Sequence, residues 1–111
     1  MAEYTLCAVY HRMIASQLSR EQQLDDLADI EKEKMQDMIT LAKSAANEEH
    51  GIEFGSEAFL DEWRYHIGQM EKRIDRNYAN MYRLKYRYRE HCQKVAARVA
   101  SNKETAKEST R

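Results

Sequence analysis

The sequence predicts an all-α fold, a long antiparallel helical hairpin of the coiled-coil type. Three observations predict it: the 111 residues contain no proline and three glycines, a third of them are charged, and apolar residues recur at alternating steps of three and four across residues 56–100. A chain of this length forms one small domain around a single core. We therefore expect one helical domain over residues 1–100 and a disordered polar tail over residues 101–111.

The first expected helix covers residues 4–18 and is apolar on much of its circumference. Such a helix needs cover on more than one side, so we expect a separate or bent N-terminal helix that docks on the rest. Glu3, His11 and Arg12 interrupt the apolar core that a signal peptide would need, and the chain has no apolar run of membrane-spanning length. We therefore expect a cytoplasmic protein without membrane contact.

The second expected helix covers residues 20–48 and is amphipathic. Its apolar stripe is flanked by acidic residues and consists of Leu24, Leu27, Met35, Met38, Leu41, Ala42 and Ala45. Gly51 and Gly55 then predict a turn, after which Ser56 is a candidate N-cap.

The third expected helix covers residues 56–100, and its length determines the architecture. Its seam consists of Leu60, Trp63, Ile67, Met70, Ile74, Asn77, Met81, Leu84, Tyr88, His91, Val95 and Arg98. A helix of about 65 Å needs a partner of similar length, which residues 4–47 supply when the chain folds back at the turn. A second copy of the chain could complete a bundle as a homodimer.

Charge divides the chain into an acidic and a basic half. Residues 1–62 hold five Lys/Arg and fourteen Asp/Glu, whereas residues 63–111 hold thirteen and five, so the halves carry about -9 and +8. We expect these halves to attract each other within the fold. The alternative is that they present separate acidic and basic surfaces to partners.

The residues that commonly carry chemistry are few and scattered. Cys7 and Cys92 are expected as two buried thiols, although a bend after the first helix could bring them together as a disulfide. Of the four histidines, His66 has Glu62 four residues away, which is half of a metal site at most. There is no phosphate-binding glycine loop and no hydrolase motif. We expect no enzyme, no metal, no cofactor and no small-molecule substrate.

The stretch RNYANMYRLKYRYRE, residues 76–90, separates aromatic from basic side chains on a helix. Tyr78, Tyr82 and Tyr86, spaced four apart, form one flank of the seam. The opposite flank is a basic face of Lys72, Arg76, Arg83, Arg87 and Lys94. The tyrosine flank is a second apolar surface that needs cover from the N-terminal segment, from a second copy or from a foreign protein.

These observations favour a non-catalytic helical protein that acts as an adaptor, chaperone or inhibitor. Tyr78, Tyr82 and Tyr86 would bind the partner protein, and Trp63 is either a core anchor near the turn or part of the same surface. Two alternatives remain open. The basic face could bind nucleic acid along its phosphates, or the chain could be a homodimeric structural or secretion-system subunit.

Two resemblances accompany this interpretation. Tyr86 followed by Glu90 in a helical hairpin of about one hundred residues resembles the small WXG-type substrates of type VII secretion, which implies an exported helical subunit. The sequence departs from that family because Trp63, Arg64 and Tyr65 follow the turn where W-x-G is expected at it. In architecture alone, the expected hairpin is similar to chaperones of type III and flagellar export and to small phage-encoded inhibitors.

Overall fold

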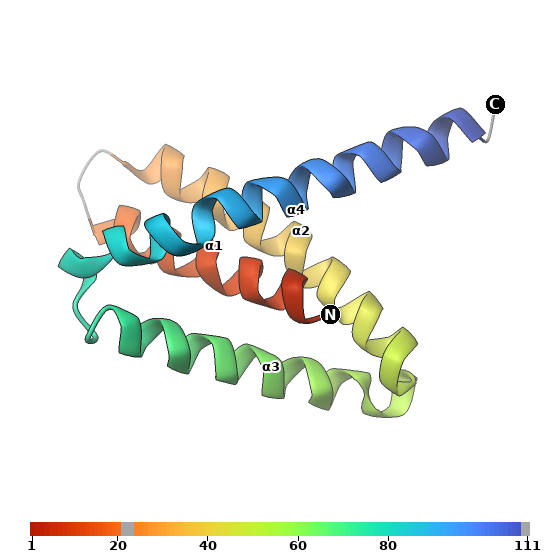
Figure 1. The fold of residues 1–111 in the computed structure, drawn as a ribbon, viewed down its shortest axis with the longest axis horizontal. Coiled ribbons are helices and arrows are strands. Elements are labelled where there is room, and N and C mark those ends of the chain that lie inside the picture. The colour runs from red at the N-terminus through yellow and green to blue at the C-terminus, as the bar shows by residue number, and fades with distance from the viewer. Residues whose placement is uncertain (21–23, 110–111) are drawn as a thin grey trace.

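The structure is a computed structural model that describes residues 1–20 and 24–109, with side chains through residue 101. The described residues form four α-helices and one 3₁₀ turn, so the predicted all-α class is confirmed (Figure 1). In chain order these are α1 (Ala2–Arg20), α2 (Asp25–His50), α3 (Ile52–Arg73), the turn η1 (Tyr78–Asn80) and α4 (Tyr82–Ser109).

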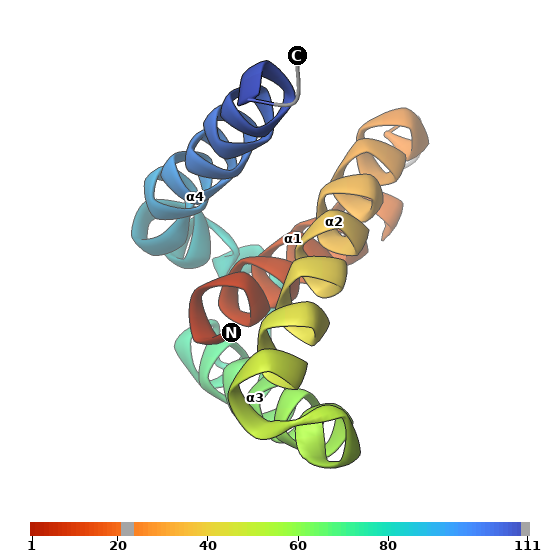
Figure 2. The same ribbon diagram turned by 90° about the vertical axis from the view of Figure 1, so that its right-hand side faces the viewer.

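Helix α1 lies at the centre of the molecule. It contacts α2, α3 and α4, and α2 and α4 diverge from each other on its two sides (Figure 2). Its buried residues point in several directions around the helix and are Thr5, Cys7, Ala8, Val9, Tyr10, His11, Met13, Ile14 and Ala15. The N-terminal helix is therefore covered on more than one side, as its apolar circumference predicted.

The core forms where the apolar stripes of the other helices meet α1. The seam predicted for the C-terminal half supplies as many buried residues to the main cluster as α1 does, and these are Met70, Ile74, Met81, Leu84, Tyr88 and Val95. Full burial of an apolar side chain of this size stabilises a fold by about 1.5–3 kcal/mol. A smaller cluster around Ala42, Ala46 and Phe59 joins α2 to α3 near their turn.

The expected continuous helix over residues 56–100 is wrong. The helix ends at Arg73, and Asp75 and Arg76 adopt left-handed backbone conformations with φ of 53° and 55°. The Asn80 side-chain amide donates a hydrogen bond of 2.9 Å to the carbonyl of Ile74, which stabilises the reversal. The chain thus folds back here, because α4 can bury its seam against α1 only after such a reversal.

The turn between α2 and α3 is present, but it is shorter than expected. Gly51 has a φ of 81°, which a side-chain-bearing residue rarely adopts, and α3 begins at the next residue. Ser56 therefore lies inside the helix and Gly51 occupies the N-cap position. Gly55 lies so close to Asn47 that a Cβ atom there would overlap it, so this glycine allows α3 to approach α2.

The expectation of two free thiols is wrong, because Cys7 and Cys92 form a disulfide. Their Cα atoms are 5.5 Å apart and both side chains are buried. The bond exists because the reversal after α3 lays α4 antiparallel on α1. Arg98 of α4 hydrogen-bonds Glu3 at the start of α1 at 2.6 Å, which agrees with that direction.

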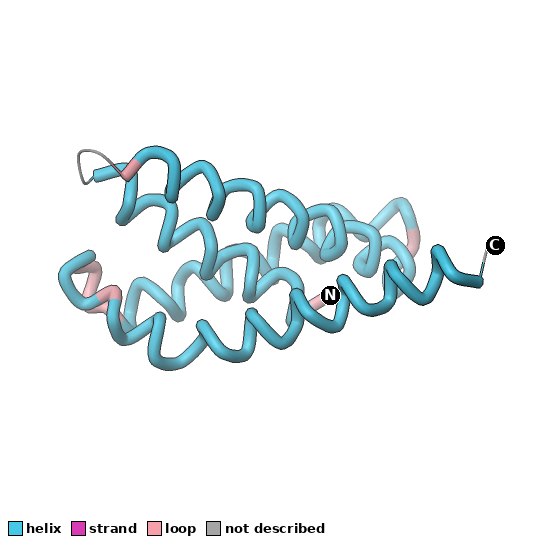
Figure 3. Tube along the Cα trace, turned by 90° about the horizontal axis from the view of Figure 1, so that it is seen from above, coloured by secondary structure: helices cyan, strands magenta, loops and turns pink. Residues whose placement is uncertain are grey.

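Helix boundaries differ from expectation in α1, which covers Ala2–Arg20 instead of residues 4–18, and at the end of α4. Residues 21–23, within the expected helix over residues 20–48, lie outside the described residues. The backbone is helical through Ser109 rather than disordered from residue 101, and residues 110–111 lie outside the described part. The Lys, Glu and Ala of this segment are strong helix formers. Seen from above, the end of α4 extends beyond the other helices (Figure 3).

Among the described residues, no helix combines the length and the apolar character that crossing a membrane requires.

Candidate partner-binding groove

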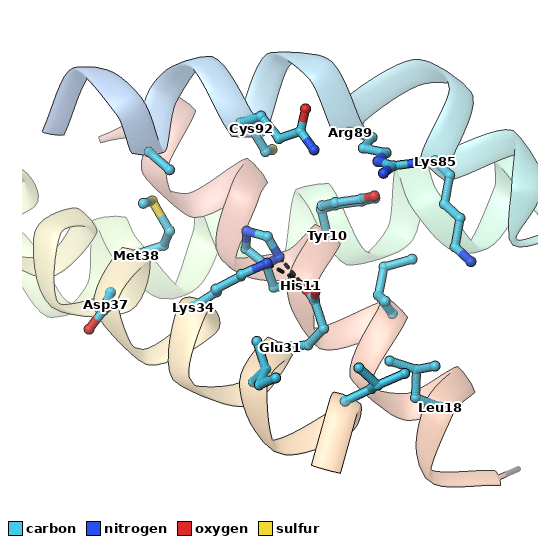
Figure 4. A pocket seen from close by; sticks show the side chains of 15 residues that line it. Tyr10, His11, Leu18, Glu31, Lys34, Asp37, Met38, Lys85, Arg89 and Cys92 are labelled. Atoms are coloured by element: carbon cyan, nitrogen blue, oxygen red, sulfur yellow. Dashed lines mark hydrogen bonds and ion pairs between the residues drawn. The ribbon is translucent and has the colours of Figure 1, made fainter. Parts of the chain in front are cut away.

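A groove of about 490 Å³ lies between the diverging helices α2 and α4, with α1 as its floor. We refer to it as the α2–α4 groove (Figure 4). The floor consists of Tyr10, His11, Ile14 and Leu18; the α2 wall of Leu27, Ile30, Glu31, Lys34, Asp37 and Met38; and the α4 wall of Lys85, Arg89, Cys92, Gln93 and Ala96.

The polar centre of the groove is a hydrogen bond between His11 on α1 and Glu31 on α2. His11 Nδ1 lies 2.6 Å from Glu31 Oε2, and Lys34 Nζ lies 3.4 Å from Glu31 Oε1. Burial of Glu31 acts to raise its pKa, but the hydrogen bond with His11 and the charges of His11 and Lys34 outweigh it and lower the pKa below its ordinary value. The carboxylate is therefore charged and already satisfied by its two neighbours.

Tyr10 places a neutral hydroxyl beside this pair. Burial and then the charge of Glu31 raise the pKa of Tyr10 to about 12, against a smaller opposite effect of Arg89. The phenol stays protonated at physiological pH and can donate a hydrogen bond into the groove.

The α4 wall is basic. Lys85 and Arg89 are exposed, and neither forms an ion pair with any residue that the structure describes. Among the described residues, the expected attraction between the two charged halves is realised in a single ion pair across the fold. In the described part of the chain, Arg98–Glu3 is the one ion pair that joins α4 to α1 or α2. The reason is that α1 lies between the acidic α2 and the basic α4.

Exposed apolar side chains border the groove on both sides. On α2, Leu27 and Ile30 are 49% and 48% exposed, and on α4, Tyr82 and Tyr86 are 62% and 94% exposed. At 100° per residue, Tyr82 and Tyr86 lie roughly 20° and 60° around α4 from Arg89, on the outer side of the basic wall. Two of the three predicted tyrosines therefore lie on α4 next to the basic wall without lining the groove, and the guanidinium of Arg83 lies 5.8 Å from the ring centre of Tyr82.

Tyr78 and Trp63 lie elsewhere. Tyr78 belongs to η1, is partly buried against the core, and is covered by the guanidinium of Arg20 at 4.0 Å from its ring centre. Trp63 on α3 is partly buried, with its ring 5.9 Å from that of Phe59 and 6.0 Å from the guanidinium of Arg12. The structure does not bring either of them to the groove.

The five residues of the predicted basic face lie on three separate segments. Lys72 is in the last turn of α3 and Arg76 lies in the reversal, while the other three residues, Arg83, Arg87 and Lys94, are on α4. Arg83 donates hydrogen bonds to the Arg73 carbonyl at 3.0 Å and to Asp75 at 3.1 Å. Lys94 pairs with Glu90 at 3.3 Å. Arg83 thus stabilises the reversal rather than extending a free basic row.

The sequence did not lead us to predict the groove, although one of its residues indicated it. Ile30 is apolar and lies outside the stripe predicted for α2, so it indicated a second apolar side of that helix. The pairing of His11 with Glu31 had no comparable signal, because it depends on how α1 and α2 are aligned.

No group of three or more His, Cys, Asp or Glu side chains with metal-binding geometry occurs in the described residues. His66 and Glu62 do meet, at 3.1 Å, but as a pair within α3. Comparisons of this chain with protein-family models, with curated proteins and with solved structures find no match.

Proposed function

We propose that this chain is a non-catalytic protein-interaction module that binds a segment of a partner protein in the α2–α4 groove, as an adaptor, chaperone or inhibitor does. The observation that carries the proposal is the composition of the groove edges. Half-exposed Leu27 and Ile30 line the α2 wall, and exposed Tyr82 and Tyr86 lie on α4 next to the residues of the opposite wall. Exposed apolar side chains gathered at one groove are typical of partner-binding sites, and tyrosine is enriched among the residues that dominate binding energy.

The polar groups where the floor meets the α2 wall are consistent with binding rather than catalysis. Glu31 is held by His11 and Lys34, and its lowered pKa keeps it charged instead of ready to exchange a proton near neutral pH. In such a site these groups fix the floor while the apolar edges supply the contact area.

The test is capture of the partner from nuclease-treated native lysate with tagged protein. The variant Tyr82→Ser/Tyr86→Ser and the variant Ile30→Glu should each lose the captured protein, because they remove the aromatic edge and place a charge in the apolar wall. Tyr65→Ser is the matched control, since Tyr65 is 61% exposed on α3, a helix that contributes no residue to the groove.

Circular dichroism and thermal unfolding establish that each variant keeps its helices. Capture that survives both groove variants, or that Tyr65→Ser abolishes equally, would contradict the proposal. Capture that disappears on nuclease treatment alone would make nucleic acid the partner and the basic residues its site.

The cytoplasmic location expected from the sequence remains a prediction. The Cys7–Cys92 disulfide is of a kind more common in oxidising compartments. Fractionation of cells that express the tagged chain, with thiol labelling before lysis, would show where the protein resides and whether the bond forms there.

A further inference from the structure

We infer that the occupant of the α2–α4 groove is an amphipathic α-helix of a partner protein, with acidic residues beside its apolar stripe. This inference rests on the proposed function and names the chemical class of the partner. It follows from the dimensions of the groove, from the distribution of apolar and charged side chains along it, and from what the chain itself could place there.

The dimensions suit a short helix. The walls extend from Leu27 to Met38 on α2 and from Lys85 to Ala96 on α4, which is about 16 Å along each helix at 1.5 Å per residue. Three turns of helix have this length. Two helical walls above a helical floor leave the space in which a further helix packs, with side chains at i, i+3 or i+4, and i+7 directed inward.

The exposed apolar side chains of the groove and its two α4 cations lie at the same end of the groove. Cys7 and His11 are one turn apart on α1 and meet Cys92 and Glu31, so the antiparallel α4 places Arg89 level with Glu31. Lys85 is one turn further along, towards Leu27. Figure 4 shows Lys85 and Arg89 across from Glu31, with Tyr10 between them.

At the end of the groove near Leu27 and Glu31, the two cations of the α4 wall lack a paired opposite charge among the described residues. Glu31 is occupied by His11 and Lys34, whereas Lys85 and Arg89 pair with no residue that the structure describes. A helix that buries its apolar stripe here places one of its flanks against these two cations, in a partly desolvated environment. Glu or Asp on that flank is attracted to the cations, whereas Lys or Arg there is strongly unfavourable.

The part of the chain that the structure describes offers no spare helix of this kind. Most of the apolar side chains of α1, α2 and α4 are buried in the core, and the large exposed ones, Leu27, Ile30, Tyr82 and Tyr86, lie in or next to the groove itself. The exposed apolar residues of α3, which are Ile52, Phe54, Leu60 and Tyr65, spread over roughly 220° of its circumference instead of forming one stripe. A second copy therefore offers no continuous apolar stripe, and a foreign helix is the better fit.

The experiment is a display selection on the full-length chain. The probe is a library of helical peptides of about 16 residues with a fixed apolar stripe and with flanking positions varied among Glu, Gln and Lys. Selection on the native chain should enrich Glu on one flank, and a selected peptide should bind about tenfold more tightly than its Gln counterpart. The variant Lys85→Glu/Arg89→Glu should enrich Lys on that flank instead.

Arg87→Glu is the matched control, because Arg87 lies about 160° around α4 from each of the groove cations and should leave the preference for Glu unchanged. Two results of the selection would overturn the inference. One is that no selected peptide binds the native chain and loses binding to the Ile30→Glu variant; the other is that the charge-reversed variant selects the same flank residues as the native chain. Light scattering that shows a dimer disrupted by Ile30→Glu would overturn it in favour of a second copy. In each of these cases lysate capture still decides the proposed function separately.

Discussion

The contact of His11 with Glu31 places a charged carboxylate among apolar side chains, where the floor of the α2–α4 groove meets its α2 wall. A half-buried carboxylate is tolerated there because His11 and Lys34 both satisfy it, and its attraction to them exceeds the cost of burial. The same pair fixes the alignment of α1 against α2. One interaction thus holds the groove floor and positions its α2 wall.

The pair should make stability depend on pH in the acid range. The folded protein binds the Glu31 proton more weakly than the unfolded chain, because the folded-state pKa lies below the ordinary value of 4.5. Its contribution is therefore present above pH 4.5 and is lost as pH falls through the folded-state pKa. Glu31→Gln should cost about 1–3 kcal/mol near neutral pH and much less in acid.

Urea unfolding followed by circular dichroism at a series of pH values measures this effect. Glu33→Gln is the matched control, since Glu33 is an exposed carboxylate on the same helix. The interpretation of the pair is wrong if both variants change the free energy of unfolding by the same amount at every pH.

At the scale of the element, the reversal between α3 and α4 is the feature that periodicity could not predict. The apolar seam continues through it without a change of step, because Ile74 and Met81 are both buried on the same core. Asn77 caps the 3₁₀ turn by accepting a hydrogen bond of 3.0 Å from the amide of Ala79. Side-chain hydrogen bonds of asparagine compete with the helix in this way, and no glycine or proline marks the break.

Glycine at the reversal should stabilise the protein. Arg76 is exposed and has a φ of 55°, a conformation that costs a residue with a side chain about 1–2 kcal/mol and glycine nearly nothing. Arg76→Gly should raise the free energy of unfolding by about 1 kcal/mol. Arg87→Gly, at an exposed position inside α4, should lower it by about the same amount.

Chemical denaturation of the two variants beside the native chain is the measurement. A continuous helix through residue 76 would make both substitutions destabilising, so a lower free energy of unfolding for Arg76→Gly would contradict the reversal itself.

At the scale of the whole molecule, the sequence determined which faces are buried but not how the helices are arranged. The stripes containing Met38, Met70 and Leu84 were predicted as core and are core. The position of α1 between α2 and α4 was not predictable, because the apolar pattern of a single helix does not specify which other helices pack on its sides. That position creates the groove, leaves Lys85 and Arg89 unpaired among the described residues, and brings Cys7 to Cys92.

The disulfide should therefore hold α4 to the rest of the molecule. It joins residues separated by 85 positions, and a bond that closes a loop of this size stabilises the folded state by about 2–4 kcal/mol. Reduction should lower the free energy of unfolding by that amount. On reduction, the exchange of amide hydrogens with solvent should accelerate more in α4 than in α2 and α3, because α4 is the element that loses its covalent link.

Hydrogen exchange and urea unfolding with and without reductant measure the two effects. The double variant Cys7→Ala/Cys92→Ala should behave like the reduced native chain and respond to reductant no further. Unchanged exchange in α4 on reduction would show that side-chain packing alone holds α4 on α1. The α4 wall of the groove would then keep its position whether the cysteines are oxidised or reduced.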